Sequence, residues 1–230
     1  MREKLSYLLK WATVLSALGG VLLSLVSARS HGYSHWSKRL LYFTAQSNLW
    51  IGLTTLAILL LPLCKLKKQE KWKRILYVGK YAFTVSIAMT CLVFCGFLAP
   101  FADESYHVWA FSSFLTHIFS PLFAIADFFT DPYRVPLKNY QAVLALLPPL
   151  FYFAPVILMC AFGVDFGRGV AYPYYFLDFR SPLGFFGVSK HLPALGSVYW
   201  ILLFTITMVA LSLVFVWLNG KLYTKKCRRV

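Results

Sequence analysis

The sequence predicts an all-α membrane protein in which six transmembrane helices form a single domain over residues 1–230. Two observations predict this class. Of the 230 residues, 59% are hydrophobic and only 13% are charged, which excludes an ordinary water-soluble domain. Apolar stretches of about 20 residues, long enough to cross a bilayer as a helix, also recur along the chain with short connections between them. The predicted helices cover residues 5–27, 40–63, 76–99, 108–129, 140–162 and 197–218.

The first helix is predicted from "LSYLLKWATVLSALGGVLLSLVS", residues 5–27. This stretch is too long for the apolar region of a typical secretion signal, and further spans follow it. We therefore expect it to remain as the first membrane helix.

The basic residues predict the orientation of the helices. The net charge is +15, and Lys and Arg concentrate in alternate connections, above all in "KLKKQEKWKR" at 65–74 and "KLYTKKCRR" at 221–229. Because cytoplasmic segments of membrane proteins carry the excess of basic residues, both termini are predicted in the cytoplasm. The same alternation favours membrane lipid headgroups as partners of the basic segments and argues against nucleic acid.

The second predicted helix, 40–63, carries a polar stripe. Thr44, Ser47, Asn48 and Thr55 fall within about 100° of one another at 100° per residue. Thr and Ser are common in membrane helices as packing residues, so this stripe has a purely structural interpretation as well. In the third helix, 76–99, Cys91 and Cys95 lie one turn apart. The five cysteines are scattered, which predicts neither a disulfide framework nor a metal site.

The fourth predicted helix, 108–129, holds a histidine and an aspartate in "LTHIFSPLFAIAD". Its polar residues also share a sector of about 100°; they are Ser113, Thr116, His117, Ser120 and Asp127. Ionisable groups inside a bilayer usually serve a function. His117 is expected roughly 15 Å from the start of the helix, near the midplane, and Asp127 about 15 Å farther on. The two side chains are therefore too far apart for a direct hydrogen bond.

The last two helices are joined by the one long connection, 163–196. Its "YPYYFLDFRSPLGFF" is rich in aromatic residues, Gly and Pro, which predicts a folded cap at the membrane interface. An aromatic belt that only anchors the two helices is the alternative. Kinks at Pro121 and Pro148–Pro149 are expected to open a cavity between helices four and five.

The residue types at these positions suit acyl transfer. A threonine hydroxyl becomes a nucleophile when a base takes its proton, so Thr44 and His117 are the candidate catalytic pair. Asn48, Ser47, Ser120 or backbone N–H groups are candidates for holding an oxyanion. Arg168 or Arg180 is a candidate for binding a substrate carboxylate. No cofactor is predicted.

Three short motifs carry a family resemblance. "FTAQSNLW" at 43–50, "HIFSPLFAIAD" at 117–127 and "YPYYFLD" at 172–178 occur in that order among the six spans. They resemble the androgen-induced protein family of six-helix hydrolases, most closely its prokaryotic members. The resemblance implies a membrane threonine hydrolase that cleaves fatty acid esters of hydroxy fatty acids. It also implies that Thr44 and His117 are catalytic, that Asp127 is a supporting acid and that the outer motif contributes Tyr172, Pro173, Phe176, Leu177 and Asp178. One departure is Phe114, where animal members carry a second histidine.

The sequence thus predicts a lipid-ester hydrolase, integral to a membrane that the resemblance suggests is a bacterial cytoplasmic membrane. Its expected partners are membrane lipids and a fatty acyl ester substrate. The alternative is a transporter or lipid-binding protein without enzymatic activity, in which His117 and Asp127 bind protons or a ligand. No feature of the sequence predicts an oligomeric state.

Overall fold

The computed structural model describes residues 2–65, 67–101, 108–189 and 195–227. The predicted class is confirmed: the described segments contain six helices long and apolar enough to span a membrane, and they contain no β-strand. Three of the six begin the bundle: α1 is Arg2–Val26, α2 is Phe43–Leu60, and α3 is Gln69–Val93. A turn of 3-10 helix, Leu61–Leu63, extends α2, and a π-helical turn, Phe94–Leu98, extends α3.

The remaining spans are less regular. The fourth consists of α4, Phe111–Phe114, a π-helical turn, Leu115–Phe119, and α5, Ser120–Thr130. The fifth begins as a 3-10 segment, Asn139–Leu146, and continues as α6, Leu147–Ala161; the sixth is α7, Ser197–Cys227. Both predicted proline sites mark these changes of helix type, because Pro121 is the second residue of α5 and Pro148 is the second residue of α6. A proline is tolerated there since the first turn of a helix needs no N–H from it.

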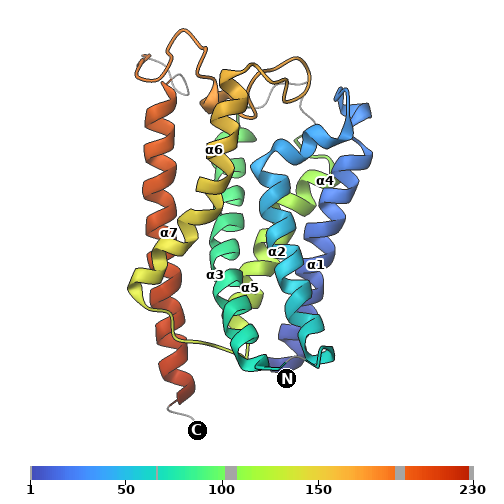
Figure 1. Ribbon diagram of the computed structural model, residues 1–230, viewed down its shortest axis with the longest axis vertical. Coiled ribbons are helices and arrows are strands. Elements are labelled where there is room, and N and C mark those ends of the chain that lie inside the picture. The colour runs from blue at the N-terminus through green and yellow to red at the C-terminus, as the bar shows by residue number, and fades with distance from the viewer. Residues whose placement is uncertain (1, 66, 102–107, 190–194, 228–230) are drawn as a thin grey trace.

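Four of the spans form a compact bundle. The first helix, α1, packs against α2 and α5, and α3 packs against both of these helices from the other side. The fifth and sixth spans lie beside this bundle, where α7 contacts α3 and the Asn139–Leu146 segment (Figure 1). The start of α1 and the end of α7 lie at the same end of the molecule, here called the termini end. The opposite end is the cap end.

The bundle is held closely together at two glycines of neighbouring helices. A Cβ on Gly20 of α1 would lie 2.8 Å from the Thr116 side chain, and one on Gly52 of α2 would lie 2.7 Å from Leu18. Small residues let membrane helices approach each other at such distances. The contact at Gly20 places α1 directly behind the π-helical turn that carries His117.

Two segments fold over the cap end, and we call them together the cap: residues 28–42 and 163–189 (Figure 1). The first contains a 3-10 helix, Trp36–Leu41, which the sequence assigned in part to the helix over 40–63. An extended Tyr42 separates it from α2. Lys38 of the first segment forms an ion pair with Asp165 of the second. Residues 102–107 and 190–194 of the predicted connections lie outside the described residues.

Candidate functional site

Thr44 and His117, which come from different spans, meet at the cap end of the bundle. Thr44 is the second residue of α2, and His117 lies in the π-helical turn between α4 and α5. The hydroxyl oxygen Oγ1 of Thr44 lies 3.2 Å from Nε2 of His117. The His117 side chain is buried, with 6% of the residue exposed. The distance allows direct proton transfer between the two groups.

The hydrogen bonds of His117 fix which ring nitrogen carries the proton. Nδ1 lies 3.0 Å from the backbone carbonyl oxygen of Ser113. A carbonyl can only accept, so Nδ1 is the protonated nitrogen and donates to it. Nε2 then presents its lone pair and accepts the hydrogen bond from the Thr44 hydroxyl. This is the tautomer that a general base for Thr44 requires.

Two π-helical turns meet at this imidazole. His117 belongs to one of them, and Phe94, the first residue of the other, stacks on its ring with centroids 3.9 Å apart and an interplanar angle of 17°. Turns of this kind are rare and recur at functional sites. Stacking from Phe94 and the Ser113 hydrogen bond together hold both the plane and the rotation of the ring.

The backbone of Thr44 lies in the first turn of α2. As a first-turn residue Thr44 has an N–H without a partner inside the helix, and it donates instead to the hydroxyl of Tyr174 at 3.4 Å. The positive end of the helix dipole is directed toward this point. Tyr174 was not among the residues that we selected from the sequence, although it lies inside the "YPYYFLD" motif.

Two of the three polar residues expected near Thr44, Asn48 and Ser47, join neighbouring helices in this structure. Asn48 donates to the carbonyl oxygens of Thr44 at 2.8 Å and Thr116 at 3.0 Å, which uses both hydrogens of its amide. Ser47 contacts the Thr90 hydroxyl on α3 at 3.1 Å. Ser120 is fully buried, and its hydroxyl has no hydrogen-bond partner among the described residues. An oxyanion role for Asn48, Ser47 or Ser120 stays a prediction.

A polar cavity of about 470 Å³ opens above Thr44 and His117 toward the cap. Arg39, Arg168 and Tyr172 line it, so two of the predicted substrate-binding residues, Arg168 and Tyr172, share a cavity with Thr44 and His117. The guanidinium of Arg39 lies 4.1 Å from the centroid of the Tyr33 ring, and that of Arg168 lies 5.4 Å from it. Arg39 was missed by sequence reasoning because it precedes the polar stripe and belongs to a separate 3-10 helix.

Tyr42 closes one wall of this polar cavity. Its hydroxyl accepts from Tyr33 at 3.2 Å and donates to the Phe166 carbonyl at 3.4 Å. Burial, together with Tyr33, raises the pKa of Tyr42 well above its ordinary value, so the phenol remains neutral. Tyr42 is consequently a hydrogen-bonding wall of the cavity and not a second base.

Asp178 and Arg180 do not line the polar cavity. The carboxylate of Asp178 accepts the backbone N–H of Arg180 at 3.0 Å, and the guanidinium of Arg180 donates to the carbonyl of Ala161 at the end of α6. Arg180 therefore fastens the long cap segment to α6, Asp178 stabilises a turn within that segment, and a substrate-binding role for Asp178 stays a prediction.

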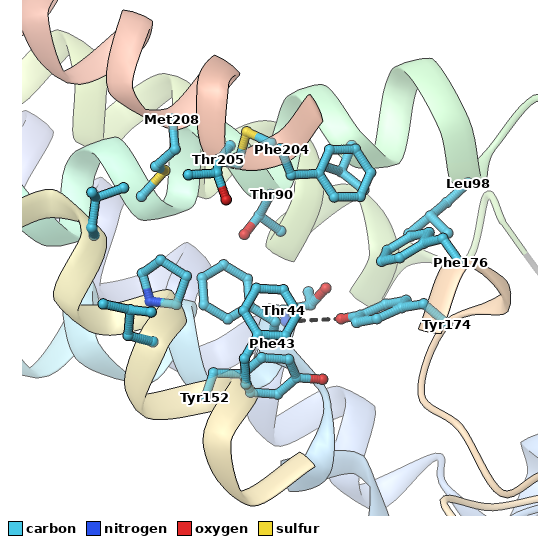
Figure 2. Close-up of a pocket in the computed structure, with 16 residues that line it drawn as sticks. Phe43, Thr44, Thr90, Leu98, Tyr152, Tyr174, Phe176, Phe204, Thr205 and Met208 are labelled. Atoms are coloured by element: carbon cyan, nitrogen blue, oxygen red, sulfur yellow. Dashed lines mark hydrogen bonds between the residues drawn. The ribbon is translucent and has the colours of Figure 1, made fainter. Parts of the chain in front are cut away.

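A second cavity, apolar and about 130 Å³ in volume, lies on the other side of Thr44. Figure 2 shows its wall, with α6 and α7 on opposite sides and Thr44 between Phe43 and Tyr174. Aromatic and sulphur-containing side chains dominate this wall, among them Phe43, Tyr152, Phe204 and Met208. Thr44 thus lines both cavities, whereas His117 lines only the polar one.

Asp127 lies at the termini end, in a buried cluster of two lysines and two aspartates. Lys10 lies 2.9 Å from Asp127 and 2.9 Å from Asp131, and Lys80 lies 2.6 Å and 2.8 Å from them. Burial opposes ionisation of Asp131, but Lys80 and Lys10 outweigh it and hold its pKa below the ordinary value. We call these four residues the ion-pair cluster. The hydrogen bonds described for His117 include none to Asp127.

The described residues contain no group of three or more His, Cys, Asp or Glu side chains that could hold a metal ion. No protein-family model, no curated protein and no solved structure matches the chain.

Proposed function

We propose that the protein is an intramembrane hydrolase of lipid esters in which Thr44 is the nucleophile and His117 is the general base and acid. One observation carries the proposal: the Thr44 hydroxyl lies 3.2 Å from Nε2 of His117, whose other ring nitrogen, Nδ1, lies 3.0 Å from the Ser113 carbonyl oxygen. Nucleophile, base and an orienting acceptor in series are the arrangement used by enzymes that transfer acyl groups. Here the Ser113 carbonyl is the orienting acceptor, so no carboxylate is needed beside the imidazole.

The reaction follows from the positions of these groups. Nε2 of His117 takes the hydroxyl proton while Oγ1 of Thr44 bonds to the ester carbonyl carbon. The tetrahedral intermediate collapses as His117 returns this proton to the leaving alcohol oxygen, which gives an acyl-threonine. A water molecule, deprotonated by His117, then attacks the acyl carbon and releases the fatty acid and the Thr44 hydroxyl. The oxyanion forms beside the first turn of α2, where the positive end of the helix dipole favours negative charge.

The polar cavity supports an ester that carries an anionic group. A guanidinium binds a carboxylate through two parallel hydrogen bonds, and both Arg39 and Arg168 line the cavity above the catalytic pair. The Nε atom of Arg39 is buried without a hydrogen-bond partner among the described residues. These features suit the fatty acid ester of a hydroxy fatty acid that the family resemblance implies, because such an ester has a free carboxylate.

The proposed orientation in the membrane follows from the basic residues. The termini end carries the basic residues of 67–74 and Lys221 and Lys225, so we place it in the cytoplasm of a bacterial cell, with the cap and the polar cavity on the outer side of the cytoplasmic membrane. The alternative of a proton-coupled transporter is less well supported, because Asp127 is paired with two lysines far along the helix from His117.

The test is hydrolysis by purified protein in detergent. Fluorogenic acyl esters and branched fatty esters are offered to the wild type, Thr44→Val and His117→Gln, with Thr55→Val as the matched control on the same helix. We expect losses of about 10²-fold to 10⁴-fold in the two site variants, and near wild-type rates in the control. A fluorophosphonate probe should label the wild type at Thr44. Equal rates in all four proteins would contradict the proposal.

A further inference from the structure

Thr44 lines two cavities of opposite character, one polar and one apolar. An ester likewise has two halves, an acyl chain and an alcohol. The polar cavity contains His117 and arginine side chains, and the apolar cavity contains Phe43, Tyr152 and Met208. A nucleophile bonded to the acyl carbon stands between the acyl chain and the leaving alcohol. The two cavities therefore provide one place for each half, and the position of His117 decides which half takes which place.

His117 returns the proton to the leaving oxygen, so the alcohol half must lie on the side of His117. That side is the polar cavity, since His117 does not line the apolar one. Water that later attacks the acyl-threonine must also be deprotonated by His117 and must reach it from the same side. The acyl chain is left with the apolar cavity, whose wall of aromatic and methionine side chains suits a hydrocarbon chain.

The apolar cavity opens sideways between α6 and α7. Leu150 on α6 and Thr205 on α7 both line it, and both are exposed on the outer surface of the bundle, Leu150 with 60% of its area. Surface at this depth of a membrane-spanning helix faces lipid. Three other lining residues, Thr90, Met89 and Met208, are buried and close the cavity toward the bundle. Figure 2 shows Thr205 and Met208 on the α7 side and Tyr152 on the α6 side.

Resting on the proposed hydrolase function, we propose that the acyl chain of the substrate enters this cavity directly from the bilayer, between α6 and α7. The side chains at the opening, Leu150 and Thr205, then determine which acyl chains reach Thr44. A short chain needs little of the cavity and can approach within the polar opening at the cap. A long chain must occupy the whole apolar cavity and pass its opening.

The first experiment narrows the opening. Thr205→Trp places a large ring at the opening of the cavity. The matched control, Ile206→Trp, places the same ring one residue away, at a position that is 66% exposed and does not line the cavity. Rates are measured for butyryl and palmitoyl esters of one fluorogenic alcohol. We expect Thr205→Trp to lower the palmitoyl rate about tenfold or more, as for misfit in a hydrophobic pocket, with the butyryl rate kept within about twofold. Ile206→Trp should change neither rate.

Equal effects of Thr205→Trp on both esters, or no effect on either, would overturn the inference.

A binding experiment separates this result from a failure of the hydrolase itself. Palmitic acid that carries a photoreactive diazirine is activated with the full-length protein in lipid nanodiscs, and labelled peptides are identified by mass spectrometry. Labelling of α6 and α7 beside the cavity, reduced by Thr205→Trp and not by Ile206→Trp, supports lateral entry even if no ester is cleaved. Labelling that is the same in the three proteins would contradict it.

Discussion

The molecule has two buried polar regions, and they differ in almost every physical respect. At the cap end, Thr44 and His117 form a neutral pair beside two cavities. At the termini end, the ion-pair cluster holds four charges, and the lysine and aspartate side chains in it are at most 9% exposed. The first region has room for a ligand. The second is closed by its own side chains.

This difference teaches how to separate a reactive polar group from a structural one inside a membrane protein. Each charge of the ion-pair cluster has two partners of opposite sign, and the cluster joins α1, α3 and the end of α5. At the cap end the Thr44 hydroxyl has a base as its neighbour and a cavity on either side. Complete pairing indicates a structural role, while an open side next to a base indicates chemistry.

The largest expected effect is the loss of stability when Asp127 is replaced. Asp127→Ala leaves Lys10 and Lys80 with half of their compensating charge, and breaking a buried ion pair in this way costs about 3–5 kcal/mol. We expect a large fall in the thermal unfolding temperature in detergent, while the protein that remains folded at low temperature keeps its rate of ester hydrolysis. Differential scanning fluorimetry and the ester assay measure the two effects separately.

The matched control for Asp127→Ala is Glu70→Ala. Glu70 also pairs with a lysine at the termini end, Lys73 at 2.6 Å, but 74% of its side chain is exposed. An exposed pair contributes about 0–1 kcal/mol, so the unfolding temperature should hardly change. A stable Asp127→Ala protein without hydrolytic activity would place Asp127 in the reaction and remove the distinction between the two regions.

The sequence predicted the contact between Thr44 and His117 better than the surroundings of Asp127. Polar stripes on two helices and the family resemblance pointed to Thr44 and His117, and those side chains do meet. No role was predicted for Lys10 and Lys80, by contrast, although they are buried within α1 and α3 and pair with Asp127. Pairing between helices depends on how the helices are rotated and displaced against one another, and the periodicity of a single helix does not contain this information.

The same limitation explains what else was missed at the site. Phe94 is an ordinary aromatic residue in an apolar stretch, and only packing of α3 against the fourth span shows that it covers His117. The fourth span was expected to begin at residue 108, but α4 begins at Phe111. His117 therefore lies about 9 Å along the span instead of roughly 15 Å, which brings it nearer to the cap. Neither π-helical turn has a signal in the sequence pattern.

A smaller effect, on the rate of ester hydrolysis, is expected when Phe94 is replaced, because Phe94 stacks on the His117 ring. Phe94→Leu keeps an apolar side chain but removes the flat surface stacked at 3.9 Å on His117. We expect kcat to fall about tenfold with KM nearly unchanged, because the loss concerns the orientation of the base and not substrate binding. Phe94→Tyr, which keeps the ring, should restore most of kcat.

Phe128→Leu is the matched control for Phe94→Leu. Phe128 is fully buried and stacks on Tyr77 with centroids 5.5 Å apart, in the half of the bundle that contains the ion-pair cluster. Both substitutions should lower stability by about 1–2 kcal/mol, but only the one beside His117 should lower kcat. A fall of kcat in proportion to lost stability in both variants would show that Phe94 has a packing role alone.

The smallest effect is expected at the surface of the cap, where Lys38 and Asp165 join its two segments. The hydrogen bond from Lys38, with that from the Gly167 N–H, lowers the pKa of Asp165 below its ordinary value of 3.8. A depressed pKa means that the pair stabilises the folded cap above the ordinary pKa and that this contribution disappears as pH falls through the lowered one.

Asp165→Asn should therefore speed hydrogen exchange in residues 28–42 and 163–189 at pH 7, measured against wild type at the same pH. The difference between the two proteins should shrink as pH falls through the lowered pKa of Asp165, since the wild-type carboxyl is then also protonated. Asp131 titrates in the same direction, but it is present in both proteins, so its effect cancels in the comparison. A difference that persisted at low pH would mean that the side chain of Asp165 stabilises the cap through packing or a neutral hydrogen bond, and not through its charge. Charge would then stabilise the ion-pair cluster but not the cap.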